Sequence, residues 1–257
     1  MFADVNGIRL AYDDEGSGIP LVFIGGFCTD RAYFSRFAGS LPGFRVICPD
    51  NRGSGETEYT GQFSIEDMAD DVVALLDHLG VDRAHVFGWS MGGHIAQSIA
   101  IRYPGRVRSL TLVSTYTRRP ARSAYLIGSI SSMVVEGKAP MEALMVAVNS
   151  LILTESRFRR IEEKGTGVRN LLCIDQPERV GHQLTAIDGY DTTDLVGSIT
   201  APTLVVHGDR DMMVDVDLGR DLHTRIAGRG YGEVPGAGHV VDVMDFVQEF
   251  MAHLMEN

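Results

Sequence analysis

One stretch constrains the fold of this chain more than any other: residues 86–94, VFGWSMGGH. An apolar run leads into Gly-x-Ser-x-Gly, and apolar residues follow at helical spacing. This order predicts a strand, a sharp turn and a helix, with Ser90 at the apex of the turn. The glycines support this interpretation because a strained turn leaves little room for side chains beside the serine. The backbone N–H of Met91 would then lie at a helix N-terminus, where developing negative charge is stabilised.

Length and charge limit the kind of protein that can carry this turn. The chain has 257 residues, of which 44% are hydrophobic and 22% charged, as expected for a soluble core in one α/β domain with an insertion or in two small domains. The net charge of −11 argues against nucleic acid or an anionic membrane as the main partner, because both bind clustered Lys and Arg. Neither is therefore expected as the main partner of this chain.

The cysteines and the N-terminal residues bear on location and metal binding. Cys28, Cys48 and Cys173 are far apart and show no metal-ligand spacing, which predicts neither a disulfide framework nor a zinc site. The first residues lack the pattern of a secretion signal, and no apolar run approaches the ~18 residues of a membrane-spanning helix. We therefore expect a cytoplasmic protein that does not bind a membrane.

Strands and helices are predicted to alternate along most of the chain. Short apolar or alternating runs predict strands at 2–5, 8–12, 21–24, 45–48, 84–87, 109–113, 203–206 and 231–234. Periodic runs predict helices at 34–41, 65–79, after Ser90, at 216–226 and at 240–255. The first two strands are expected to form a hairpin, with a polar loop at 13–18, and Ser64 and Asp67 are expected to cap the helix at 65–79. This alternation predicts an α/β fold with a mostly parallel sheet flanked by helices.

The alternation stops between residues 118 and 190. This region contains helical patterns at 124–135, 141–153, 155–164, 167–174 and 177–190 but no convincing strand. We interpret it as a helical cap inserted above the sheet between two core strands. The predicted domains are therefore a first part of the core at 1–117, the cap at 118–190 and a second part of the core at 191–257.

Three residues at strand ends suggest nucleophilic catalysis. A serine hydroxyl is a poor nucleophile unless a base accepts its proton and a carboxylate orients that base. His239 lies in a Gly-rich loop after the last predicted strand, and Asp211 follows the strand before it. Ser90, Asp211 and His239 stand in the chain order nucleophile, acid, base, and are the candidate catalytic residues.

Four motifs together make the sequence similar to a known family. They are Gly-Gly-Phe at 25–27, DNRGSG at 50–55, GWSMG at 88–92, and GDRD at 208–211 with GH at 238–239. With these motifs the chain resembles the α/β-hydrolase superfamily over almost its whole length. Within it, residues 183–204 are similar to the return from cap to core in the small-cap group that contains enol-lactonases and carboxylesterases.

The resemblance implies a role for each matching residue. Ser90 would attack a carbonyl carbon, His239 would carry the proton and Asp211 would orient His239. Phe27 and Met91 would donate the two backbone N–H groups of an oxyanion hole. No metal or organic cofactor is implied. The family usually has His-Gly before the oxyanion residue, whereas this chain has a glycine in place of that supporting histidine.

Other polar residues offer alternatives to these roles. Asp209 is a second candidate for the acid, although the family spacing favours Asp211. Candidate pocket residues are Gly26, Trp89 and His182. The arginines that begin the cap either recognise a substrate carboxylate or form a solvated helix start; they are Arg118, Arg119 and Arg122. A cysteine nucleophile at Cys28 is disfavoured because nothing marks its thiol as activated. Asp50 and Arg52 are expected to bond backbone groups in a structural turn, and His207 to be a buried residue at a strand end. His94 is expected to pack one turn into the helix after Ser90, Asp215 and Asp217 to be solvated residues at a helix start, and Asp242 to be a carboxylate in the first turn of the last helix.

The sequence therefore predicts a serine hydrolase that cleaves a small ester or lactone through an acyl-enzyme. The same residues could hydrolyse a carbon–carbon bond in a β-diketone-like substrate or act as a perhydrolase. A ligand-binding, receptor-like module that retains the three residues is the alternative outside enzymes. Acyl chemistry follows from the triad, but the cap determines the substrate, and cap side chains cannot be oriented from sequence.

Overall fold

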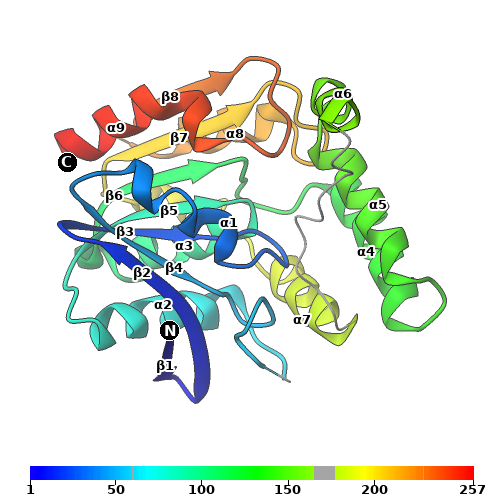
Figure 1. Ribbon diagram of the computed structural model, residues 1–257, viewed down its shortest axis with the longest axis horizontal. Coiled ribbons are helices and arrows are strands. Elements are labelled where there is room, and N and C mark those ends of the chain that lie inside the picture. The colour runs from blue at the N-terminus through cyan, green and yellow to red at the C-terminus, as the bar shows by residue number, and fades with distance from the viewer. Residues whose placement is uncertain (60, 165–176, 228) are drawn as a thin grey trace.

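An eight-stranded sheet forms the centre of the computed structural model, which describes residues 1–59, 61–164, 177–227 and 229–257 (Figure 1). The strands are β1 Phe2–Val5, β2 Ile8–Gly16, β3 Ile19–Ile24, β4 Phe44–Pro49, β5 Ala84–Trp89, β6 Val107–Val113, β7 Thr203–Gly208 and β8 Arg229–Val234. Their spatial order is β1-β2-β4-β3-β5-β6-β7-β8. β3 to β8 run parallel, and β1 and β2 are antiparallel to their neighbours, so the predicted mostly parallel α/β sheet is confirmed.

The N-terminal hairpin forms where predicted, around Asn6 and Gly7, both of which have positive φ. The polar loop predicted at 13–18 is wrong for residues 13–16, because β2 continues to Gly16. Residues 12–16 pair antiparallel with 45–49 of β4. This distant partner holds a polar segment in an extended conformation that its own sequence does not indicate.

The helices are α1 Ala32–Ser35, α2 Ile65–His78, α3 Met91–Arg102, α4 Ala121–Val135, α5 Met141–Ile152, α6 Glu155–Lys164, α7 Pro177–Asp188, α8 Val216–Arg225 and α9 Val247–Glu256. The capping box of α2 is confirmed: Asp67 N–H donates to Ser64 Oγ at 3.1 Å, and Ser64 N–H donates to Asp67 Oδ2 at 2.8 Å. Two predicted helices are shorter than expected. The segment at 34–41 contains only the end of α1 and a 3₁₀ turn at 38–40, and α9 follows a 3₁₀ turn at 243–246.

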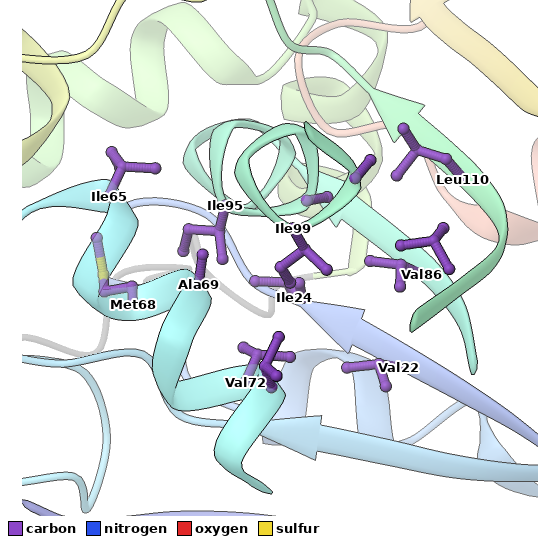
Figure 2. Close-up of a cluster of buried hydrophobic side chains, with 14 of the residues drawn as sticks. Val22, Ile24, Ile65, Met68, Ala69, Val72, Val86, Ile95, Ile99 and Leu110 are labelled. Carbon is purple, nitrogen blue, oxygen red and sulfur yellow. The ribbon is translucent and has the colours of Figure 1, made fainter. Parts of the chain in front are cut away.

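Two hydrophobic cores cover the two faces of the sheet. On one face, Val22 and Ile24 pack beneath α2 and α3 (Figure 2). Leu21 and Phe23 alternate with them in β3 and face the core that includes α1 and α9. Each fully buried aliphatic or aromatic side chain contributes roughly 1.5–3 kcal/mol, so both faces must be covered for the sheet to be stable.

Helices α4 to α7 gather at one end of the molecule, beside the C-terminal ends of the parallel strands (Figure 1). They lie between β6 and β7 in the chain, and the segments that enter and leave them meet at a bridge between Arg118 and Asp191. The boundaries of the cap at 118 and 190 stay predictions. The helix predicted at 167–174, with Cys173, lies outside the described residues. Within the described residues, no helix is both long and apolar enough to cross a membrane.

Candidate active site

Ser90 lies at a strained turn between β5 and α3. Its φ of +56° and ψ of −119° are unfavourable for a residue with a side chain, and such strain persists only where the surroundings enforce it. Ser90 N–H donates to Val113 O at 3.0 Å, which ties the turn to β6. A Cβ on Gly92 would lie 2.2 Å from Ile24 O, so the start of α3 can approach the sheet only without a side chain there.

The three candidate catalytic side chains form one hydrogen-bonded chain. Ser90 Oγ lies 2.9 Å from His239 Nε2, and His239 Nδ1 lies 2.8 Å from Asp211 Oδ2. These residues are separated by up to 149 positions in the sequence and come from the ends of β5, β7 and β8. Asp211 and His239 are buried, so solvent competes little for these hydrogen bonds. The structure thus brings all three together in the arrangement that nucleophilic catalysis requires.

Four donors converge on the Asp211 carboxylate. Oδ1 accepts hydrogen bonds from the N–H groups of Met213 and Val214 at 2.9 and 2.8 Å. Besides the His239 contact, Oδ2 lies 3.2 Å from His207 Nε2. Burial by itself would raise the pKa of this carboxyl, but the two histidines outweigh that effect and lower the pKa to about 2. Asp211 is therefore ionised at neutral pH.

His207 is a residue at this site whose contact with the acid the sequence did not reveal. Its predicted place as a buried residue at the end of β7 is correct. Its Nε2 also lies 3.0 Å from Val214 O, and because a carbonyl only accepts, Nε2 carries a proton. The spacing of four residues between His207 and Asp211 is the only signal in the sequence that could have suggested this contact.

Trp89 supports the loop that carries the candidate base. Its indole N–H donates to His239 O at 3.0 Å, and its ring stacks on Tyr33 with centroids 5.4 Å apart. The same ring also lines the cavity at Ser90, as the sequence suggested for this residue. Trp89 therefore both shapes the cavity and fixes the backbone of the base.

The candidate oxyanion-hole residues lie on either side of Ser90. Phe27 and Met91 line the same cavity as Ser90, and neither backbone N–H has a hydrogen-bond partner in the part of the chain that the structure describes. A Cβ on Gly26 would lie 3.3 Å from Ser90 Cβ, which shows how closely this loop approaches the serine. In this loop, which lacks the usual histidine, Gly25 O accepts a hydrogen bond from Asn51 Nδ2 at 2.9 Å.

A cavity opens above Ser90. Most of its lining is apolar and comes from both the core and helices α4, α5 and α7; it includes Phe27, Tyr116, Ile127, Val148, Leu184 and Ile187. Arg119 and Ser123 are the polar lining residues from the start of the cap. His182, a candidate pocket residue, is not part of this lining, and its ring lies 6.1 Å from that of Phe63.

The three arginines that begin the cap have different surroundings. The side chain of Arg118 is 76% exposed, whereas that of Arg119 is only 7% exposed and pairs with Asp188. Arg122 donates to Met212 O at 2.7 Å. A solvated helix start therefore describes Arg118 and not Arg119, which lines the cavity.

The remaining polar candidates have structural contacts. Asp209, the alternative acid, accepts a hydrogen bond from Gly236 N–H at 2.6 Å, outside the triad. His94 packs against the rings of Tyr116 and Tyr190, and burial lowers its pKa to about 4. Asp215 lies at the start of a helix, as predicted, and caps α8. Asp242 is not in the first turn of a helix; it caps the 3₁₀ turn at 243–246.

The polar turn after β4 agrees with its structural interpretation in part. Asp50 accepts hydrogen bonds from the backbone N–H groups of Arg31 and Glu56, as predicted. The prediction that Arg52 bonds backbone groups is wrong, because its guanidinium forms a buried ion pair with Asp71 of α2. Burying one of these charges without the other would be strongly unfavourable, so they are buried together.

No group of three or more His, Cys, Asp or Glu side chains among the described residues is arranged to hold a metal ion. The chemistry that this site can support with its own side chains is proton transfer and nucleophilic attack by Ser90.

Known proteins share this fold. The family model described as the alpha/beta hydrolase fold matches residues 19–138. The crystal structure of the enol-lactonase from Burkholderia xenovorans LB400 is 26% identical, with a TM-score of 0.87 over 100% of this chain and 98% of that chain. A thermophilic esterase from Thermogutta terrifontis is 28% identical, with a TM-score of 0.83 over 98% and 94% of the two chains. "Putative non-heme bromoperoxidase BpoC" of Mycobacterium tuberculosis is 28% identical over 91% of each chain. With this sheet, this turn at Ser90 and these similarities, the chain has the α/β-hydrolase fold.

Proposed function

We propose that this protein is a serine hydrolase that cleaves a small-molecule ester or lactone through an acyl-enzyme on Ser90. The observation that supports it most directly is the continuous chain from Ser90 Oγ to His239 at 2.9 Å and from His239 to Asp211 at 2.8 Å, at the base of an apolar cavity. The similar enol-lactonase and esterase structures support the same reaction class.

The reaction follows from these contacts in two steps. In the first, Ser90 Oγ bonds to the carbonyl carbon while its proton moves to His239 Nε2, and the ester or lactone C–O bond then breaks as His239 returns that proton to the leaving oxygen. In the second, a water molecule attacks the acyl-enzyme, gives its proton to His239 and releases the acid, and Ser90 recovers its proton. The ionised Asp211 stabilises the imidazolium in both steps.

The negative charge that develops on the carbonyl oxygen needs donors that are already in place. The backbone N–H groups of Phe27 and Met91 fit this role, and Met91 adds the favourable potential at the N-terminus of α3. Losing one such donor typically slows catalysis by about 10²–10³-fold. The apolar residues of the cap would bind the acyl chain and exclude water from the first step.

The test is labelling of the whole protein with a fluorophosphonate probe, followed by location of the label by peptide mass spectrometry. We expect one label on Ser90, none on the Ser90→Ala variant, and turnover of a panel of esters and lactones. Absence of label on folded wild-type protein would contradict the proposal. Labelling at Ser90 with stoichiometric retention of a ligand and no turnover would instead favour a ligand-binding module.

A further inference from the structure

A glutamine of the cap is built into the support of the candidate oxyanion hole. Gln183 lies in α7, its side chain is completely buried, and each of its two polar atoms bonds to a segment more than 120 residues away. Its Oε1 accepts hydrogen bonds from Cys28 N–H at 2.7 Å and from the Cys28 thiol at 3.1 Å. Its Nε2 donates to Arg52 O at 2.7 Å and to Ser54 Oγ at 2.9 Å. This amide therefore joins three separate segments at one point.

The segment that Oε1 holds is the turn that orients the N–H of Phe27. Thr29 N–H donates to Gly26 O at 3.2 Å, which closes a tight turn with Phe27 and Cys28 at its centre. In the trans peptide between Gly26 and Phe27, the carbonyl and the N–H point in opposite directions. Because Thr29 fixes the carbonyl, it also directs the Phe27 N–H away from the turn.

Cys28 occupies a position in this turn that its side chain disfavours. Its φ of +52° lies in the left-handed region, where glycine is the usual residue and a residue with a side chain is strained. Such a conformation persists only if nearby contacts enforce it. The hydrogen bond from Cys28 N–H to Gln183 acts directly on the backbone of the strained residue.

The turn at 50–55 provides the fixed base for this arrangement. Asn51 holds Gly25 O at 2.9 Å on one side of the oxyanion loop, and Gln183 joins Cys28 to Arg52 and Ser54 on the other. The loop is thus held on both sides of Phe27 by groups anchored in one turn. In proteins with this fold, a histidine in the loop usually gives this support, and in this chain Gly25 occupies the position of that histidine.

We infer that Gln183 is a positioning residue that holds the Phe27 N–H in place for the oxyanion and couples this donor to the cap. The coupling arises because the neighbouring residues of α7, Leu184 and Ile187, line the cavity. A substrate that packs against α7 thereby stabilises the same helix that holds the oxyanion loop. This inference rests on the proposed hydrolase function, and its test separates the two.

The test compares the wild type with Gln183→Met, which keeps the length of the side chain and removes all four hydrogen bonds. The matched control is Gln97→Met. Gln97 is equally buried and bonds to Tyr116 O and Thr192 Oγ1, which lie outside the oxyanion loop. Both variants should lower the melting temperature. All rates are divided by the fraction of Ser90 that takes up the fluorophosphonate label at completion, so that misfolded protein does not count.

For hydrolysis of 4-nitrophenyl butyrate, we expect Gln183→Met to lower kcat by about 10- to 100-fold with KM changed less than about threefold, because one oxyanion donor is worth about 10²–10³-fold. The inhibition constant of an alkyl trifluoromethyl ketone should rise by a similar factor, because the ketone forms a tetrahedral oxyanion with Ser90. Gln183→Glu keeps the acceptor for Cys28 N–H and should recover part of kcat. Gln97→Met should keep kcat close to that of the wild type.

The possible outcomes distinguish a failure of the inference about Gln183 from a failure of the proposed hydrolase function. Wild-type protein that neither labels at Ser90 nor turns over the ester would overturn both. An active wild type with kcat and ketone inhibition unchanged in Gln183→Met would overturn the inference alone. So would an equal loss of kcat in Gln97→Met, because that result would assign the effect to general destabilisation, and so would a change confined to KM.

Discussion

Replacing Asp211 by asparagine tests the triad most sharply, because the structure shows what each donor around this carboxylate would meet. With its oxygen toward the N–H groups of Met213 and Val214, the new amide side chain would keep both of those hydrogen bonds. Its NH₂ group would then face His207 Nε2, which carries a proton, and His239 Nδ1. His239 would have to move its own proton to Nε2, where it could no longer accept the proton of Ser90.

The energy of the opposite orientation of the amide determines how far kcat should fall. It restores the correct form of His239 but turns the NH₂ group toward two backbone N–H groups, one half-buried and one buried, each of which loses its acceptor. An unsatisfied buried donor costs about 1–3 kcal/mol, so the productive orientation lies about 2–6 kcal/mol higher. We therefore expect kcat to fall by about 30- to 10⁴-fold.

The assay is kcat for 4-nitrophenyl butyrate together with the rate of fluorophosphonate labelling, with Asp209→Asn as the matched control. Asp209 lies two residues earlier, accepts a hydrogen bond from Gly236 N–H and forms a weak ion pair with Arg210, so its variant should retain most of kcat. Melting temperatures of both variants show whether they are folded at the assay temperature. A loss of less than about tenfold in Asp211→Asn, or an equal loss in Asp209→Asn, would refute this account of the acid.

Three further predictions follow from burial, charge and close packing. Folding lowers the pKa of Asp211 from 3.8 to about 2, so ionisation of this carboxyl adds about 2 kcal/mol to the free energy of unfolding above pH 4. That contribution is lost as the pH falls through 3.8 toward 2. The urea midpoints of the wild type and Asp211→Asn should therefore converge in that window. Arg119→Gln should raise KM about tenfold for esters whose acyl group ends in a carboxylate, and should change KM little for their neutral analogues. The control is Arg118→Gln, at an exposed side chain, which should leave KM unchanged for both kinds of ester. Gly92→Ala should lower the free energy of unfolding, measured in urea, by about 3 kcal/mol, because the added Cβ would lie 2.2 Å from a backbone oxygen. In the control Gly105→Ala the added Cβ meets nothing within 4 Å, so the free energy of unfolding should change by less than about 1 kcal/mol.

Much of the fold could be predicted because its signals are local. The hairpin at Asn6 and Gly7, the capping box at Ser64 and Asp67 and the turn at Ser90 each depend on a few neighbouring residues whose backbone preferences decide the structure. The order of strands and helices followed from periodicity in the same way. Errors arose where a distant partner decided the outcome, as in the continuation of β2 along β4.

The sequence by itself determined the fold class, the order of Ser90, Asp211 and His239, and the placement of each at the end of a strand. Only the tertiary structure decided which groups meet those residues. His207 on the acid, Trp89 on the base loop and Gln183 on the oxyanion loop are contacts of this kind. A hydrogen bond between residues 150 positions apart leaves no periodic or local trace, because its energy depends on how the packed elements bring two groups together.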